Sequence, residues 1–174
     1  MKKIVFCGAL LVSTAQVHAA WRYQAWEDPI DGSRMRRAGV ESTVAADPAT
    51  LVLQRAEGGE TTVMITIRRG QFWCPQRCDV KMRFDDKLPP LTVSARPAED
   101  GSSDVLFLGG ERFVLEELLA AKRVRVELPL FRAGLRIYTF EVKGLRWELP
   151  APSAVYSLPE QSSPREDWGG ESRR

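Results

Sequence analysis

The chain has 174 residues, and its 25 Lys and Arg nearly balance its 23 Asp and Glu, for a formal net charge of +2. This balance argues against nucleic acid or an anionic membrane as partner, because both usually require a clustered basic surface. The length is sufficient for one hydrophobic core and one domain.

The first residues have the composition of an export signal. Lys2 and Lys3 precede an apolar run over residues 4–12, and small residues lead up to Ala19. We predict a signal peptide over residues 1–19, because the apolar run is shorter than the roughly 20 residues that a membrane-spanning helix needs. A retained anchor is the alternative. The mature protein is therefore expected in the periplasm or outside the cell, without a transmembrane segment.

Cleavage would leave 23 basic and 23 acidic residues and no histidine, since the single His18 lies in the signal. Catalytic triads and dyads that need histidine, and histidine-based zinc or copper sites, are then excluded. We expect a protein that is not an enzyme, with no metal and no cofactor.

Short apolar stretches separated by turn residues indicate β-strands along most of the remaining chain. In residues 61–68, Val63, Ile65 and Ile67 alternate with more polar residues, which is typical of a strand with one buried face. Strands are expected at residues 21–26, 40–44, 51–54, 61–68, 78–84, 92–95, 104–108, 123–128 and 135–142, and residues 145–149 are expected to close the core with Leu145, Trp147 and Leu149.

One helix is expected, over residues 111–122, with an apolar stripe made by Val114, Leu115, Leu118 and Leu119. A crossover that covers the core is favoured over a helix that binds a partner. The order of elements predicts a mainly β domain over residues 20–149, an antiparallel β-sandwich with one short crossover helix. Residues 150–174 are rich in Pro, Ser, Gly and charge, which predicts a disordered tail.

Residues 70–86 hold the two cysteines that cleavage would leave, Cys74 and Cys78. In an oxidising compartment they most simply form a disulfide, and a redox pair or a metal site are the alternatives. Pro75 suits a turn position, so the cysteines are predicted to face each other at the tip of a hairpin. Phe72 would then pair with Val80, and a β-bulge would lie near Gly70.

Trp73 faces the side opposite to Phe72, so it lies either exposed at this tip or beneath a second layer of structure. An exposed aromatic side chain suits contact with a protein or a sugar. The predicted partner-binding site consists of Phe72, Trp73, Pro75, Gln76 and Arg77.

Acidic residues offer two further interpretations. Asp85 and Asp86 follow the strand after the cysteines and could act with Trp73 on a cell-wall glycan. Glu99, Asp100 and Asp104 could bind calcium, although their spacing matches no calcium-binding loop. Solvated loop acids are the simpler interpretation of both groups.

Three stretches resemble a family of small exported bacterial proteins: GQFWCPQRCDVKMRFDD, DVLFLGGERFVLEELLAAKRVRVELPLF and FEVKGLRW. That family combines a signal peptide, a paired-cysteine hairpin, an RFD strand and an F-x-V-x-G-L-x-W end, and the resemblance covers residues 21–147. More distantly, the order of elements is similar to that of small periplasmic proteins associated with type VI secretion, whose N-terminal cysteine-bearing region this chain lacks. The resemblance brings no catalytic residues with it.

These observations predict a non-catalytic exported binding or accessory protein that presents a disulfide-locked hairpin to a protein partner, such as a component of a secretion system. One alternative is an inhibitor or immunity-type protein that inserts this loop into an enzyme. The other is a carbohydrate- or cell-wall-binding module or enzyme.

Overall fold

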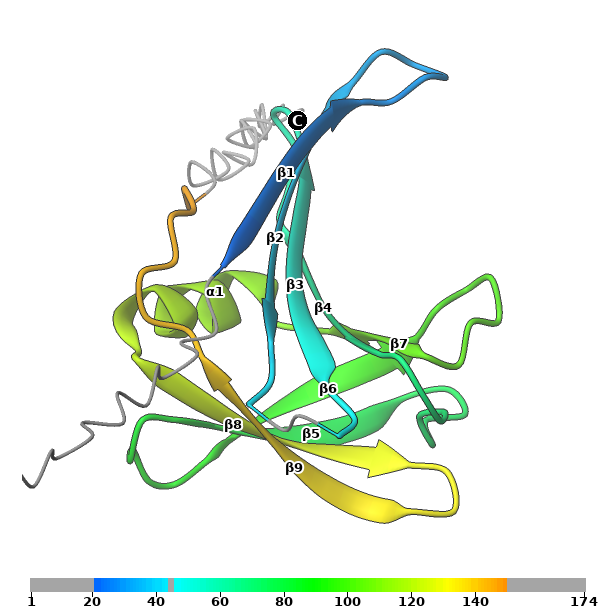
Figure 1. The fold of residues 1–174 in the computed structure, drawn as a ribbon, viewed down its shortest axis with the longest axis vertical. Helices are drawn as coiled ribbons and strands as arrows, with labels where there is room; N and C mark the ends of the chain where they lie inside the picture. The colour runs from blue at the N-terminus through cyan, green and yellow to red at the C-terminus, as the bar shows by residue number, and fades with distance from the viewer. Residues whose placement is uncertain (1–20, 44–45, 150–174) are drawn as a thin grey trace, which may run out of the picture.

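The computed structural model describes residues 21–43 and 46–149 (Figure 1). The predicted signal peptide and the predicted disordered tail lie outside these residues. Among the residues that are described, no helix has the length and apolarity needed to cross a bilayer.

The chain is mainly β and antiparallel with one short helix, as predicted. The elements are β1 (Arg22–Glu27), β2 (Arg34–Glu41), β3 (Ala49–Ala56), β4 (Thr62–Ile67), β5 (Cys78–Phe84), β6 (Leu91–Pro97), β7 (Val105–Leu108), α1 (Glu111–Ala120), β8 (Arg123–Leu130) and β9 (Gly134–Glu141). The strands form a nine-stranded sheet in the order β1-β2-β3-β4-β7-β6-β5-β8-β9.

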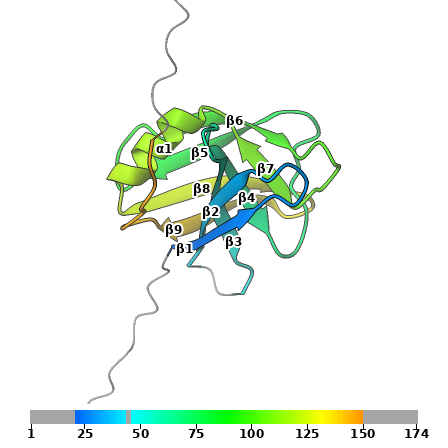
Figure 2. The ribbon, with the colours of Figure 1, turned by 90° about the horizontal axis from the view of Figure 1, so that it is seen from above.

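This sheet folds over on itself, so the two layers of the expected sandwich are the two halves of one sheet. In Figure 1, β1, β2 and β3 stand upright, whereas β5, β8 and β9 lie across their lower end, and the view from above in Figure 2 shows the two sets crossing. The halves meet where Ser42 bridges Phe140 and the Thr43 N–H donates to the Thr139 carbonyl at 2.8 Å. Nearby, the Trp21 indole donates to the Val142 carbonyl at 2.9 Å.

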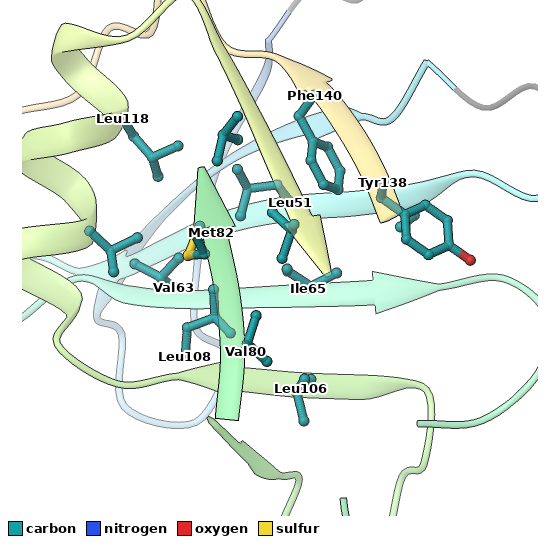
Figure 3. Packing of buried hydrophobic residues seen from close by; sticks show 14 of the residues in the cluster. Leu51, Val63, Ile65, Val80, Met82, Leu106, Leu108, Leu118, Tyr138 and Phe140 are labelled. Atoms are coloured by element: carbon teal, nitrogen blue, oxygen red, sulfur yellow. The ribbon is translucent and has the colours of Figure 1, made fainter. Parts of the chain in front are cut away.

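The core lies between the halves, and strand alternation determines which side chains enter it. Leu51, Val63 and Ile65 from the first half face residues such as Met82 and Phe140 from the second half (Figure 3). All five are fully buried, and the removal of each such side chain from water contributes about 1.5–3 kcal/mol. The inward positions predicted for residues 61–68 are therefore confirmed.

Helix α1 covers one end of this core, as expected, and begins after Gly110, whose φ of 67° suits glycine. Its side chains Val114, Leu115 and Leu118 are buried, and Leu119 is half-buried against the core. On its outer side, Glu117 pairs with Lys87 at 2.7 Å.

The predicted cysteine hairpin is wrong. Strand β4 pairs with β3 and β7, while β5 pairs with β6 and β8, so the two supposed arms are not neighbours. Phe72 bridges Leu130 and does not pair with Val80, which lies opposite Val93. With both edges of β4 occupied, the chain turns away at Gly70 (φ 86°) and crosses to the other half of the sheet, and no β4–β5 bulge exists.

The segment after β9 also differs from the expectation. Residues 145–149 form no strand, although Leu145 and Trp147 do pack against the core. The Trp147 indole donates to Thr61 Oγ1 at 3.0 Å, and the Arg146 N–H donates to the Tyr23 hydroxyl at 2.7 Å. Leu149 was expected to close the core but is exposed.

Candidate functional site

The disulfide between Cys74 and Cys78 is present, with the two Cα atoms 5.5 Å apart. It closes a short loop in which Pro75, Gln76 and Arg77 are exposed. Cys74 itself is buried, so the bond attaches this loop to the core.

Of the predicted partner-binding residues, Phe72 is wrongly assigned because it is buried, with 7 % of its surface exposed. Its neighbour Trp73 is 59 % exposed. The alternation that separates them follows from their pairing with the end of β8. The Trp73 N–H donates to the Pro129 carbonyl at 2.9 Å, and the Phe131 N–H donates to the Gln71 carbonyl at 2.8 Å. Residues 71–73 therefore behave as a short strand with one side chain inward and the next outward.

Trp73 does not project alone into solvent. Its ring lies 5.5 Å from that of Phe131, with the ring planes inclined by 32°. The guanidinium of Arg132 lies over the Phe131 ring, 5.1 Å from its centroid. These contacts hold two exposed aromatic rings at the turn between β8 and β9.

Strand β9 adds two exposed aliphatic side chains, Leu135 and Ile137, which are 63 % and 62 % exposed. Leu135 lies opposite Pro129 in the register, and Pro129 in turn contacts Trp73 through the backbone. Because Tyr138 and Phe140 on the same strand are buried, the odd-numbered residues face outward. We call the set of Trp73, Phe131, Leu135 and Ile137 the apolar patch.

Charged side chains of both signs lie next to the apolar patch. The Arg132 guanidinium lies over Phe131, and Glu127 on β8, which pairs with Lys81 at 3.6 Å, lies opposite Ile137. Arg132 forms no ion pair with any other described residue, although ten pairs occur elsewhere in this part of the chain. Arg136 forms none either, but it alternates with Leu135 and Ile137 and so lies on the opposite, inner face of β9. An exposed apolar surface with one unpaired guanidinium group beside it, that of Arg132, is suited to an apolar ligand that carries negative charge.

Two surface hollows are candidates for a ligand site. A shallow hollow of about 380 Å³ lies between Trp73, Phe131 and the loop at residues 97–103. A second hollow of about 480 Å³ lies between β1–β3 and the segment after β9, where Arg36, Arg55 and Arg146 surround Glu148. Glu148 already pairs with Arg55 at 3.5 Å and with Arg36 at 4.0 Å, which neutralises part of that positive charge.

The acidic residues that could act on a glycan have local structural partners. Asp85 Oδ1 accepts hydrogen bonds from the N–H groups of Lys122 and Arg123, each at 3.0 Å. Asp86 Oδ1 lies 3.4 Å from Arg125. The seven residues of β5 separate these carboxylates from the disulfide loop, so they lie roughly 20 Å from Trp73 and share no site with it.

In the acidic loop between β6 and β7, a carboxylate likewise accepts a hydrogen bond from the loop's own backbone. Asp100 Oδ1 accepts a hydrogen bond from the Ser102 N–H at 2.8 Å, and this bond lowers the pKa of the Asp100 carboxyl group. Within residues 21–43 and 46–149, no group of three or more His, Cys, Asp or Glu side chains is placed to hold a metal ion.

No protein-family model, curated protein or solved structure matches the chain. The structure thus supplies the observations on which a function can be proposed.

Sequence reasoning identified Trp73 but missed Phe131, Leu135 and Ile137. A usable signal was present, because Leu135 and Ile137 alternate with Arg136 and Tyr138, and both possible faces of that strand contain apolar residues. A strand with apolar residues on both faces is either buried on both sides or exposes one apolar face.

Removing the disulfide by substituting Cys74 and Cys78 with Ala should lower the free energy of unfolding by about 2 kcal/mol, because the closed loop is short. Urea unfolding of the two proteins would measure this difference. Wild-type protein kept reduced by dithiothreitol serves as the control and should lose a similar amount. Equal stability of oxidised wild type and double variant would contradict the prediction.

Proposed function

We propose that this protein is a non-catalytic exported binding protein that holds a protein partner through the apolar patch. The observation that carries this proposal is the exposure of four large apolar side chains on one side of the sheet, at Trp73, Phe131, Leu135 and Ile137. Side chains of this size exposed together usually mark an interaction site, and aromatic residues contribute most to binding energy at protein interfaces.

The make-up of the patch favours a protein over a glycan. Half of its side chains are aliphatic, and its charged neighbours are the Arg132 guanidinium beside Phe131 and the Lys81–Glu127 ion pair beside Ile137. A sugar site would need hydrogen-bond acceptors and donors beside an aromatic platform. The carboxylates of Asp85 and Asp86, which a glycan site would use, bind backbone N–H groups and Arg125 at the other end of β5.

The setting of Trp73 favours a docking surface over an inhibitory loop. An inhibitor that enters an enzyme cleft needs a side chain that projects away from its own fold. The Trp73 ring instead lies against Phe131, and its backbone is hydrogen-bonded to β8. The patch is therefore a prearranged surface, which lowers the entropy lost on binding.

The proposed location is the periplasm, which rests on the export signal predicted over residues 1–19 and is compatible with the disulfide between Cys74 and Cys78. In that compartment the distant similarity to proteins associated with type VI secretion makes a component of a secretion system the first partner to test.

The Trp73→Ala variant should lose at least tenfold in affinity for the partner, because the residue contributes the exposed indole of the patch. The measurement is retention of proteins from a periplasmic extract of the host on the oxidised, immobilised protein, followed by titration of the retained protein. The variant should stay within about 1 kcal/mol of wild type in urea unfolding, since Trp73 is mostly exposed.

Trp26→Ala is the matched control, because Trp26 is also an exposed tryptophan but lies on β1, at the other end of the strand order. It should leave retention unchanged. Equal loss in both variants, or undiminished retention by Trp73→Ala, would contradict the proposal. Retention of glycan alone would instead support a cell-wall-binding module.

A further inference from the structure

Strand β9 is the last strand of the sheet and has one long edge without a strand beside it. It pairs with β8 over the whole range from Gly134 to Glu141, and among the described residues its other edge has only the isolated bridge between Phe140 and Ser42. Toward its end, the free edge is partly used, since the Thr139 carbonyl accepts from the Thr43 N–H at 2.8 Å. The edge from Leu135 to Ile137 has no such partner among the described residues. In Figure 1 this part of β9 forms the lower border of the molecule.

The direction of the backbone groups follows from that one bond. Thr139 directs its carbonyl away from β8, and residues two positions apart on a strand direct their N–H and C=O groups to the same side. Leu135 and Ile137 therefore present both of their backbone polar groups to the open edge. The even-numbered residues should direct these groups toward β8. Val142 does so, because its N–H donates to the Lys122 carbonyl at 2.8 Å.

An open edge with two donors and two acceptors is a template for one more strand. Natural sheets often protect such an edge with a charged residue or proline, and Arg136 provides one charge here. Yet the two residues that direct their backbone outward, Leu135 and Ile137, also carry the exposed aliphatic side chains of the apolar patch. Backbone pairing and apolar contact would thus be available to the same partner segment.

We propose that β9 binds an extended segment of the partner as an added strand, and that this segment has an acidic residue between two apolar residues. The apolar residues would lie beside Leu135 and Ile137 on the outer face. The acidic residue would lie beside Arg136 on the inner face, where this guanidinium forms no ion pair with a described residue. Opposite charges directly across two strands stabilise their pairing.

A second copy of this chain fits the edge less well. In the antiparallel register that uses Leu135 and Ile137 of both copies, residue 135 of one copy pairs with residue 137 of the other. That register places Arg136 directly opposite Arg136, and like charges in this position destabilise the pair. The charge on β9 thus favours a partner with the complementary sequence.

This inference rests on the proposed function, since the added strand belongs to the partner that the apolar patch binds. Its test uses a fluorescent, end-blocked peptide of sequence Ser-Thr-Val-Glu-Val-Thr-Ser, with a Lys-for-Glu peptide as the matched control. Fluorescence anisotropy measures the affinities for the oxidised protein, and amide chemical shifts show the site. We expect the Glu peptide to bind at least tenfold more tightly than the Lys peptide and to perturb the amides of Leu135 and Ile137.

Two protein variants separate the contributions of charge and backbone. Arg136→Glu should reverse the preference, so that the Lys peptide binds more tightly than the Glu peptide. Ile137→Pro removes the outward N–H without removing a bond to β8, because that N–H points to the open edge. It should weaken binding of the Glu peptide at least tenfold, whereas Ile137→Ala should weaken it less.

Absence of binding at 1 mM peptide, or binding that neither Arg136→Glu nor Ile137→Pro changes, would overturn the inference. The intact partner then distinguishes the two proposals. If Trp73→Ala abolishes partner retention but Ile137→Pro does not, the apolar patch is the binding site and strand addition is wrong. If none of these variants changes retention, the proposed function fails as well.

Discussion

Replacing Phe140 with Ala should lower the free energy of unfolding by about 3–5 kcal/mol, a large part of the 5–15 kcal/mol typical of a domain. Phe140 is fully buried and is the largest side chain in the structure to be so. It lies opposite Val124 on β8 and bridges Ser42 at the place where the two halves of the sheet meet. The substitution would therefore remove contacts from both halves and leave a cavity at their junction.

Urea unfolding followed by tryptophan fluorescence measures this effect. Ile137→Ala is the matched control, because Ile137 lies three residues earlier on the same strand but faces solvent. The control should change the unfolding free energy by less than about 0.5 kcal/mol. A loss below about 1 kcal/mol for Phe140→Ala would show that the sheet does not close over this residue.

Replacing Asp85 with Ala should cost about 3 kcal/mol, since one carboxylate oxygen accepts two backbone hydrogen bonds, and bonds to a charged group contribute about 1.5–3 kcal/mol each before screening by solvent. These bonds connect the turn after β5 to the entry of β8. Asp85 also has φ 49°, in the left-handed region that Asp and Asn tolerate better than Ala.

Asp85→Gly and Asp85→Asn separate these two causes. Glycine removes the backbone penalty but not the loss of hydrogen bonds, so it should be less destabilising than Ala by about 1 kcal/mol. Asparagine keeps an acceptor oxygen and the tolerated backbone conformation, so it should be the mildest of the three. An order in which Asn destabilises as much as Ala would indicate that the negative charge matters more than the geometry. Each is measured as a shift in the urea midpoint at constant slope.

Local sequence patterns predicted most of the strands, because alternating burial leaves an alternating pattern of apolar residues. The strand expected over residues 40–44 is wrong: β2 runs from Arg34 to Glu41, and the mostly exposed first half of this strand has no such pattern. Val63, Ile65 and Ile67 alternate with less buried residues and all point into the core. The helix could be located for the same reason, from the spacing of Val114, Leu115 and Leu118. The disulfide was also predictable, since two cysteines in one short stretch leave little choice of partner.

Pairing between strands was not predictable from neighbouring residues. The hairpin expectation assumed that β4 and β5 pair because they follow each other in the chain. In the structure, β4 pairs with β7 and β5 with β8, and both choices depend on residues about 40 positions away. No local pattern contains that information, and Gly70 fits a bulge as well as it fits the turn that the structure has there.

The candidate site was only partly predictable for a related reason. Trp73 was identifiable because it alternates with Phe72, which correctly places the two on opposite faces. The contact between Trp73 and Phe131, however, brings together residues that lie 58 positions apart, 5.5 Å between ring centres. Such a cluster becomes visible only when the sheet has been assembled.

The closure of the sheet has a consequence for how the protein folds. Trp21 bonds to Val142 across 121 positions of sequence, and Ser42 bridges Phe140. Contacts of such high contact order form slowly, so we expect folding on the order of milliseconds to seconds. Because β9 completes both the junction and the core, a chain still being synthesised cannot adopt the final structure until its last strand has emerged. Until then, the Trp21 indole and Ser42 lack the partners that close the sheet.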